Sequence, residues 1–327
     1  MRFAKILILA GLVAAATSVG ARAQTCGLGL MASLDMTVMP NGLVTVPVSI
    51  NGTTHRFVVD TAGIFSKIAS SVAQSLGLKE VETGTELYSP KGRVKLAAAD
   101  IASLKIGANE AKHFHLAVTD EASNPASGVD GVLAADLLQV FDVEFDFAAK
   151  KMNFFSQDHC PGKVVYWTKA AYAELPFHMT SGPLAANDHI QLTTTLDGQD
   201  LITDLDTGSS TTWLRRKAAI RSFALDENSP GMTLAPYKEN GLPVYRKKFG
   251  VLRLAGVDVR DPTIDVIDDQ FDAAFRMAHS EKSRDDPVYG SSLEMEPFTL
   301  GMDVLSKLHL YIAYKEHKVY ATAADAH

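Results

Sequence analysis

The sequence predicts a mostly-β protein made of two similar halves, and three observations lead to this fold class. The chain has 327 residues, a length that suits about two domains of roughly 150 residues each. Most of it reads as short strands separated by turn residues, with only brief helical stretches. The segment at 43–73 also recurs at 189–219 with a constant spacing, so the same β unit is expected twice in tandem.

The first half begins with a predicted hairpin. A strand at 44–48 is followed by Asn51-Gly52, a turn pair that tolerates positive φ, and then by a strand at 57–61. A helix at 69–76 is expected to stop at Gly77. The remaining expected elements are strands at 81–87, 93–101, 103–106 and 113–118, an apolar segment at 132–138, and a strand pair at 143–147 and 151–155.

The second half repeats this order. A strand at 190–194 leads through the turn pair Asp197-Gly198 to a strand at 203–207 and a helical stretch at 215–223. Later elements are strands at 247–254 and 264–267, an apolar segment at 299–305, and a strand pair at 309–314 and 318–322. The extra length of this half falls mainly in a polar stretch at 279–292, which is expected to be a surface loop.

The composition narrows the function classes. Hydrophobic residues make up 46% of the chain and charged residues 21%, which excludes a disordered chain, a collagen-like repeat and a polytopic membrane protein. The formal charge of −7 argues against a protein that binds nucleic-acid phosphates. The cysteine count of 2 is too small for a disulfide-rich scaffold or a four-cysteine zinc site.

The N-terminus has the pattern of a secretory signal. Arg2 and Lys5 precede an apolar run at 6–16, and a small-x-small cleavage site follows at 21–23. The run is shorter than the roughly 20 apolar residues that cross a bilayer, so no membrane span is expected in the mature chain. We expect an exported protein, periplasmic or secreted. The expected division is a signal peptide at 1–23, a first lobe at 24–160, a linker at 161–176 and a second lobe at 177–327.

The two cysteines also depend on the compartment of the protein. In an oxidising compartment Cys26 and Cys160 can form a disulfide that ties the ends of the first lobe together. The alternative is two unrelated thiols, because sequence spacing does not show proximity.

Each half places an Asp-Thr pair at the end of an apolar strand, where a tight turn follows. Backbone N–H groups in such a turn can hold the carboxylate of Asp60 or Asp206, and the threonine hydroxyls can link the two turns. If the halves are related by a pseudo-twofold axis, the two carboxylates meet, share a proton and have separated pKa values. One can then act as a base toward water while the other donates a proton to a carbonyl oxygen.

These residues resemble a known family. Asp206-Thr207-Gly208-Ser209 resembles the active-site loop of aspartic peptidases, and Leu300-Gly301 resembles the element that crosses behind that loop. Asp60-Thr61-Ala62-Gly63 and Val132-Leu133-Ala134 occupy the same places in the first half. The segment Gly131 to Leu138 is most similar to bacterial retropepsin-like aspartyl proteases, and the two-copy arrangement is like the pepsin fold.

The resemblance implies two tandem, pseudo-twofold-related retropepsin-like β-barrel lobes with short helices. It implies Asp60 and Asp206 as the catalytic pair, without a cofactor. The implied supporting residues of the two loops are Thr61, Ala62, Gly63, Thr207, Gly208 and Ser209. It also implies a β-hairpin flap over the bound peptide, with a tip at 88–92 that includes Tyr88 and Gly92, and a matching hairpin at 235–245. An exposed loop tyrosine is the alternative interpretation of Tyr88.

The first half departs from the family at two positions. Ala62 and Ala134 stand where the family has glycine, whereas the second half keeps Gly208 and Gly301. An alanine still supplies its N–H, but a shift near 1 Å in the turn can cost about 100-fold in rate. Asp204 is a third carboxylate on the strand face of Asp206, so we expect it to raise the pKa values of the pair or to find its own donor.

Other kinds of site have little support. His113 and His115 could begin a metal site, but no third ligand stands at a useful spacing, so no metal is expected. Dinucleotide-binding, phosphate-binding, serine-hydrolase and metalloprotease motifs are absent from the sequence. Trp167 and Trp213 are interpreted as packing residues.

The leading hypothesis is an exported, monomeric aspartic endopeptidase that cuts peptides or unfolded proteins and is active on the acid side. The first alternative is a catalytically weak or inactive peptide-binding protein on the same fold, because of the two alanines. The second is a structural periplasmic β protein in which the Asp-Thr turns are coincidental.

Overall fold

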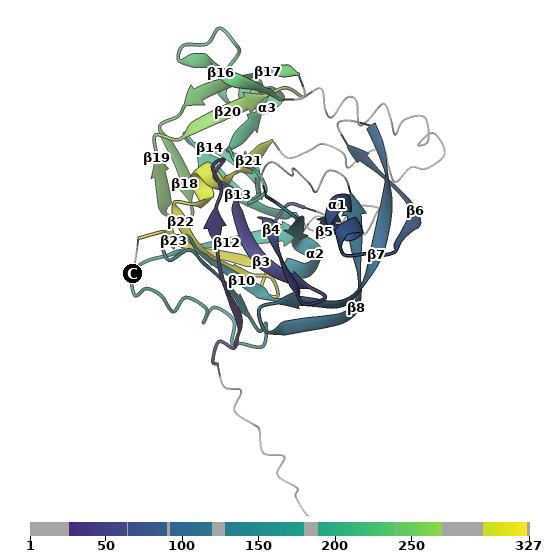
Figure 1. The fold of residues 1–327 in the computed structure, drawn as a ribbon. Coiled ribbons are helices and arrows are strands. Elements are labelled where there is room, and N and C mark those ends of the chain that lie inside the picture. Colours follow the sequence, from purple (N-terminus) through teal and green to yellow (C-terminus); the bar gives the residue numbers. More distant parts are fainter. Residues whose placement is uncertain are drawn as a thin grey trace, which may run out of the picture.

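Two β-rich lobes lie side by side in the computed structural model, joined at their base by a shared sheet (Figure 1). The structure describes residues 26–63, 65–89, 92–119, 128–179, 189–239, 241–269 and 297–325, and the backbone but not the side chains of 84–89 and 92–96. The predicted signal peptide at 1–23 and the predicted surface loop at 279–292 lie outside the described residues.

An eight-stranded sheet forms the body of the first lobe, in the order β2-β3-β4-β9-β5-β8-β7-β6. The turn pair Asn51-Gly52 has φ values of 49° and 87°, as a hairpin turn of the predicted kind requires. The elements are β2 (Thr37–Val38), β3 (Val44–Ile50), β4 (Thr53–Asp60), β5 (Lys67–Ala69), α1 (Ser70–Ser75), β6 (Glu80–Ser89), β7 (Gly92–Ile106), β8 (Asn109–Thr119), β9 (Gly131–Ala134) and α2 (Ala135–Leu138).

The second lobe uses the same local signals. Asp197 and Gly198 have φ values of 44° and 84° and close the hairpin between its first two strands. The elements are β13 (Ile190–Leu196), β14 (Gln199–Leu205), β15 (Trp213–Arg215), α3 (Arg216–Phe223), β16 (Met232–Glu239), β17 (Leu242–Lys248), β18 (Val251–Leu254), β19 (Val257–Arg260), β20 (Thr263–Ile267), β21 (Phe298–Leu300) and α5 (Met302–Leu305).

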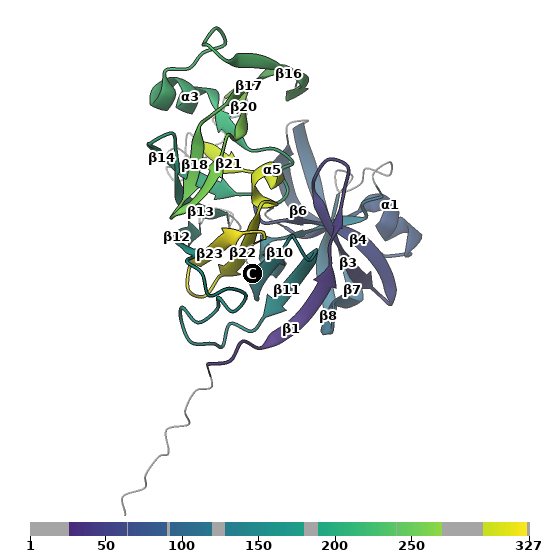
Figure 2. The same cartoon turned by 90° about the vertical axis from the view of Figure 1, so that its left-hand side faces the viewer.

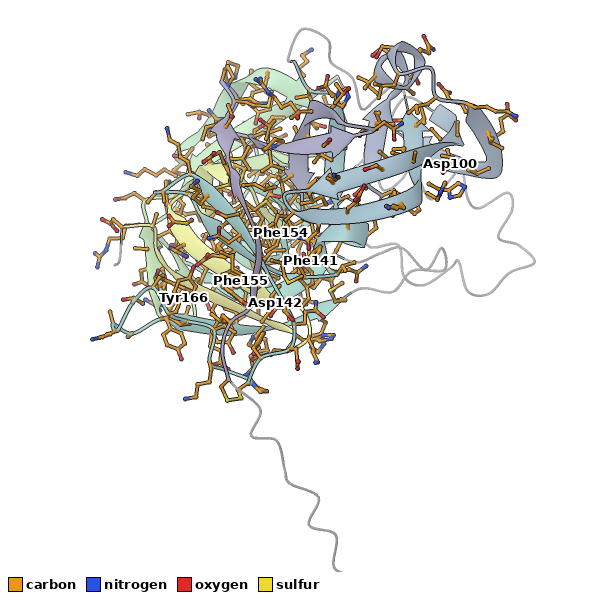
Figure 3. The ribbon with its side chains drawn as sticks, turned by 60° about the horizontal axis from the view of Figure 1, so that its bottom comes forward. Asp100, Phe141, Asp142, Phe154, Phe155 and Tyr166 are labelled. Carbon is orange, nitrogen blue, oxygen red and sulfur yellow. A yellow bond between two sulfur atoms is a disulfide. The ribbon has the colours of Figure 1, made fainter. Side chains whose placement is uncertain are left out.

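A run of strands from both lobes forms the sheet at the base, which we call the joining sheet (Figure 2). In spatial order these strands are β1 (Leu30–Asp35), β11 (Lys151–Phe155), β10 (Asp142–Asp146), β22 (Leu308–Ala313), β23 (Lys318–Ala323) and β12 (Ala173–Met179). The lobes meet where β10 pairs antiparallel with β22, for example Val143 with Ile312. The aromatic side chains Phe154 and Phe155 gather on this sheet near Asp142 and Tyr166 (Figure 3). The fold class predicted from the sequence is therefore confirmed.

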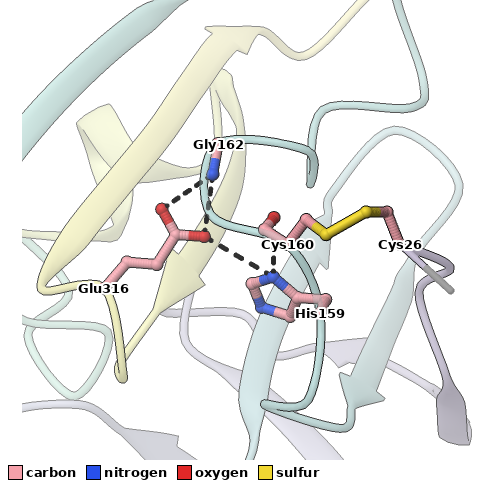
Figure 4. The surroundings of a disulfide bond; sticks show 5 residues. All are labelled: Cys26, His159, Cys160, Gly162 and Glu316. Carbon is pink, nitrogen blue, oxygen red and sulfur yellow. Dashed lines mark hydrogen bonds and ion pairs between the residues drawn. A yellow bond between two sulfur atoms is a disulfide. The ribbon is translucent and has the colours of Figure 1, made fainter. Parts of the chain in front are cut away.

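A disulfide links Cys26 to Cys160 and joins the start of the first lobe to its end (Figure 4). The two Cα atoms are 4.9 Å apart, across a sequence separation of 134 residues. Beside it, the carboxylate of Glu316 accepts hydrogen bonds from the Gly162 N–H at 3.0 and 3.1 Å. The disulfide therefore lies next to a residue of the second lobe, since Glu316 follows β22.

Two strand predictions were wrong in their bounds. The predicted strands at 93–101 and 103–106 are one strand, β7, because its register with β8 is the same from Ala97 to Ile106, although Ala102 and His113 do not pair. The predicted strand at 247–254 is two strands, because the Gly250 N–H turns away to the side chain of Asp197 at 3.0 Å. Within the described ranges, no helix has the length and apolar character needed to cross a membrane.

Candidate active site

The two predicted aspartates emerge at equivalent strand ends. β4 ends at Asp60, and β14 ends one residue before Asp206. β4 pairs in parallel with the short strand β9, so Asp60 lies across from Ala134. In the same way β14 pairs in parallel with β21, and Leu205 lies across from Leu300. The sequence pattern thus places each carboxyl group where a buried strand passes into a tight turn.

The following backbone N–H group holds each carboxylate. Asp60 Oδ1 accepts a hydrogen bond from the Ala62 N–H at 3.1 Å, and Asp206 Oδ1 accepts one from the Gly208 N–H at 2.8 Å. Ala62 therefore supplies the same donor as Gly208. The alanine in the first lobe does not remove this contact.

Thr61 and Thr207 link the two turns by a reciprocal set of hydrogen bonds. The Thr61 N–H donates to Thr207 Oγ1 at 3.1 Å, and the Thr207 N–H donates to Thr61 Oγ1 at 3.0 Å. Each hydroxyl then donates across to the opposite strand, to the Leu205 carbonyl at 2.7 Å and the Val59 carbonyl at 2.8 Å. Both threonines are fully buried, so all these groups are satisfied within the contact.

The two carboxyl groups lie against each other at the centre of this arrangement. The Asp60 and Asp206 side chains are in hydrogen-bonding contact. A Cβ atom placed on Gly208 would come within 2.5 Å of Asp60 Cγ, so Asp60 reaches into the loop of the opposite lobe. Such an approach is possible because glycine has no Cβ.

Burial and mutual repulsion raise the pKa values of this pair. Burial raises the pKa of Asp60, while the charge of Lys67 and the Ala62 N–H act against it. Burial and then the charge of Asp60 raise the pKa of Asp206 well above its usual range, and the Gly208 N–H opposes this. The pair therefore binds a proton more tightly than free carboxyls do, and its two ionisations belong to the pair as a whole.

A second carboxylate braces each loop from behind. In the first lobe Asp136 Oδ1 accepts from the Ser66 N–H at 2.9 Å and the Ser66 hydroxyl at 2.6 Å, and that hydroxyl accepts from the Ala134 N–H at 2.9 Å. In the second lobe Asp303 and Thr212 make the same contacts at 2.7 and 2.6 Å. These braces fix the short strands β9 and β21 beside the carboxyl pair.

The alanine at position 134 is accommodated by the glycine at position 63. A Cβ on Gly63 would lie 3.1 Å from the Ala134 Cβ and 2.7 Å from Asp60 Oδ2. In the second lobe the corresponding residues are Ser209, which has a Cβ, and Gly301, where a Cβ would come within 2.2 Å of the Thr211 carbonyl oxygen. In the first lobe glycine leaves room for the Asp60 carboxyl and the Ala134 Cβ, whereas in the second lobe it leaves room for the backbone of Thr211 and Ser209.

Sequence reasoning missed two charged neighbours of the pair. Lys67 lies near Asp60, and its positive charge lowers the pKa of that carboxyl. His189 lies beside Asp204, with Nδ1 and Oδ2 3.4 Å apart. Asp204 thus finds its own donor, and its charge also raises the pKa of Asp206, so both sequence expectations for it hold. A residue-by-residue comparison of the two halves would have singled out His189, because the matching first-lobe residue is Leu43.

The predicted flap segments form hairpins. β6 and β7 pair antiparallel up to Ser89 and Gly92, with Tyr88 across from Arg93, so the predicted tip is a hairpin end. The side chain of Tyr88 lies outside the described part of the chain. The second-lobe hairpin of β16 and β17 turns near its predicted place, and on it the Tyr237 hydroxyl donates to Asp265.

The other sequence candidates take structural places. No group of three or more metal-ligating side chains exists within the described ranges, so His113 and His115 on β8 gain no third ligand there. Trp167 stacks on the His309 ring with centroids 4.2 Å apart, and Trp213 lies under the Arg215 guanidinium at 5.1 Å. Both tryptophans act in packing.

Comparison with known proteins agrees with this geometry. Residues 46–137, which include the first loop and its brace, match the sequence model of a family described as aspartyl protease. No match was found among curated protein sequences. An aspartic proteinase from Irpex lacteus is similar in structure at a TM-score of 0.51 and 14% identity, over 92% of this chain and 98% of that one. Basic 7S globulin from soybean matches at a TM-score of 0.49 and 10% identity, over 92% and 100%.

The match to the aspartyl protease family model is thus confined to residues 46–137 in the first lobe, and the likeness to an aspartic proteinase across both lobes is a likeness of fold.

Proposed function

We propose that this protein is an exported aspartic endopeptidase in which Asp60 and Asp206 activate a water molecule against a peptide bond. The observation that carries the proposal is the contact of two half-buried carboxyls, each held by one backbone N–H and both fixed by Thr61 and Thr207. Carboxyls in such contact share a proton, which supplies an acid and a base in one site.

The surroundings of the pair divide these two roles. Lys67 favours the charged form of Asp60, whereas the charge of Asp60 disfavours the charged form of Asp206. In the proposed reaction the shared proton starts on Asp206, and Asp60 takes a proton from water.

The reaction then follows from proton positions. Water oxygen bonds to the peptide carbonyl carbon as Asp60 accepts the water proton and Asp206 donates its proton to the carbonyl oxygen. The tetrahedral diol that forms collapses when the leaving nitrogen gains a proton from Asp60 and the C–N bond breaks. Asp206 takes back a proton from the diol, so the products are a carboxylic acid and an amine and the pair is restored.

The proposed substrate is an extended segment of a peptide or unfolded protein. The two hairpins, β6–β7 and β16–β17, offer strand edges that can pair with an extended backbone. Export rests on the N-terminal pattern and agrees with the disulfide, since disulfides persist in oxidising compartments.

A catalytically weak peptide-binding protein is the second candidate, and Ala62 favours it. The residue carries a Cβ where the opposite loop needs Gly208 to admit a carboxyl. An outward shift of that turn would slow the reaction without closing the peptide site.

One experiment separates the two candidates. The purified chain beginning at residue 24 is incubated with a reduced, unfolded protein between pH 3 and 7, and cuts are mapped by mass spectrometry. We expect cutting that Asp60→Asn and Asp206→Asn each abolish and that Asp200→Asn, an exposed change on β14, leaves intact. Cutting that survives both active-site changes contradicts the proposal, and peptide binding without cutting at any pH supports the binding protein.

A further inference from the structure

In the second lobe, the side chains of His189 and Asp204 lie beside the carboxyl pair. His189 Nδ1 lies 3.4 Å from Asp204 Oδ2, and the two side chains are 28% and 12% exposed. Gln191 pairs with Asp204 in the antiparallel ladder of β13 and β14, and continuing this register places His189 across from Asp206. Continued past the ends of the two strands, this register puts the backbone of His189 about one strand spacing, roughly 5 Å, from the backbone of Asp206.

The first lobe provides an apolar counterpart of this pair. Thr45 pairs with Val58 in the ladder of β3 and β4, and continuing this register places Leu43 across from Asp60. Leu43 and Val58 thus occupy the places of His189 and Asp204. The basic residue and the extra carboxylate are specific to the lobe that carries Asp206.

The carboxyl group of Asp204 is only partly satisfied by hydrogen bonds. Its Oδ1 atom is buried and has no hydrogen-bond partner among the residues described. A buried carboxylate that is only partly satisfied acts strongly on its neighbours, because the local dielectric is low.

Three negative charges act on His189. They are Asp204 on β14, Asp206 at its end and Asp60 of the opposite lobe, while Lys67 faces Asp60. Burial lowers the pKa of His189, but the hydrogen bond to Asp204 and these three charges outweigh it, so the pKa is raised. A raised pKa favours the positively charged form of the imidazole.

We propose that His189 and Asp204 are positioning residues that set the proton affinity of the Asp60–Asp206 pair, and with it the pH range of the site. This inference rests on the proposed function. His189 stabilises the carboxylate form of Asp206 and Asp204 destabilises it, so the two charges act in opposite directions on one site. The positive charge of His189 limits how far burial and the charge of Asp60 raise the pKa of Asp206.

Opposite signs make the proposal testable by single substitutions. His189→Gln removes the cation and leaves Asp204, so both limbs of the pH–kcat/KM profile move to higher pH, by about one unit. Asp204→Asn removes the anion and leaves His189, so both limbs move to lower pH by a similar amount. The double variant His189→Leu/Asp204→Val has the residues of the first lobe at these positions. Its pH–kcat/KM profile is expected to lie within a few tenths of a pH unit of the parent profile. Shifts of the same sign, or none, overturn the proposal.

A second measurement does not depend on cleavage. The carbon-13 signal of the His189 ring is assigned by its loss in His189→Gln and titrated by NMR. We expect its pKa to fall in Asp204→Asn and in Asp206→Asn, and to stay unchanged in Asp200→Asn on the same strand. An unchanged pKa in Asp206→Asn overturns the coupling even in an active enzyme. In a chain that cuts nothing, the fall still supports the coupling, and only the proposed peptidase function is lost.

Discussion

The carboxyl group of Asp60 lies in the space that a side chain at position 208 would occupy. A Cβ on Gly208 would stand 2.5 Å from Asp60 Cγ and 2.6 Å from Oδ1. The glycine of one lobe is therefore part of the site of the other, and the two lobes are not equivalent, since Ala62 fills the matching place.

Substitutions at these two positions are expected to act in opposite directions. Gly208→Ala displaces the Asp60 carboxyl by about 1 Å and lowers kcat/KM by roughly 100-fold or more. Ala62→Gly keeps its N–H contact and relaxes the turn, so kcat/KM is unchanged or higher. Steady-state kinetics at the optimum pH measures both, and a large loss in Ala62→Gly would contradict this account.

The contact between positions 63 and 134 predicts a compensating pair. Gly63→Ser places a Cβ 3.1 Å from the Ala134 Cβ and is expected to lower the free energy of unfolding by about 2 kcal/mol. Adding Ala134→Gly removes the contact with the Ala134 Cβ and recovers part of this loss, while the closer contact with Asp60 Oδ2 at 2.7 Å remains. Urea unfolding of the single and double variants gives the coupling, and purely additive effects would refute it.

Gly301 is the matched control for that pair. Its Cβ would meet the Thr211 backbone oxygen at 2.2 Å, and backbone yields less than a side chain. Gly301→Ala should thus destabilise more than Gly63→Ser in the same unfolding assay.

The threonine contact is expected to govern stability and activity together. Thr61→Val removes the acceptor of the Thr207 N–H and the donor to the Leu205 carbonyl, which leaves buried groups unsatisfied. We expect a loss of about 2–4 kcal/mol in unfolding free energy. Thr61→Ser keeps both contacts and should lose under about 1 kcal/mol; equal losses would show that the hydrogen bonds do not matter.

The raised pKa values predict that the carboxyl pair favours folding in acid. Because the folded chain binds protons more tightly than the unfolded one, stability falls as the pH rises from the unfolded value of 3.8 through the raised folded pKa of Asp206. Asp206→Asn removes this loss and should melt a few degrees higher than the parent at pH 7. The gap should close near pH 3 in a calorimetric pH series, and a gap that widens toward acid would reverse the assigned sign.

A buried ion pair joins the lobes away from the active site. Glu144 on β10 accepts from the Tyr166 hydroxyl at 2.8 Å and lies 2.9 Å from His309 Nε2 on β22. Glu144→Ala should cost about 3–5 kcal/mol because it leaves the buried His309 ring without this partner. Glu174→Ala breaks the exposed pair with Lys318 and should cost less than about 1 kcal/mol in thermal unfolding. Equal costs would mean that the joining sheet does not depend on the buried pair.

Local signals explain why so much of the fold was predictable. Asn51-Gly52 and Asp197-Gly198 fix hairpins by themselves, and the Asp-Thr turns stand at matching places in each half. Contacts between distant residues were not predictable. Three such contacts depend on side chains that only folding brings together. They are Gly63 with Ala134, Lys67 with Asp60, and Glu144 with His309.

The order of strands along the chain has a consequence for biosynthesis. β22 and β23 lie in the middle of the joining sheet, yet they are among the last segments to leave the ribosome. The loop at Thr207, which contacts the loop at Thr61, is likewise translated 146 residues later. A nascent or prematurely terminated chain therefore lacks both the complete sheet and the paired carboxyls, so the candidate site forms only after the final strand has been synthesised.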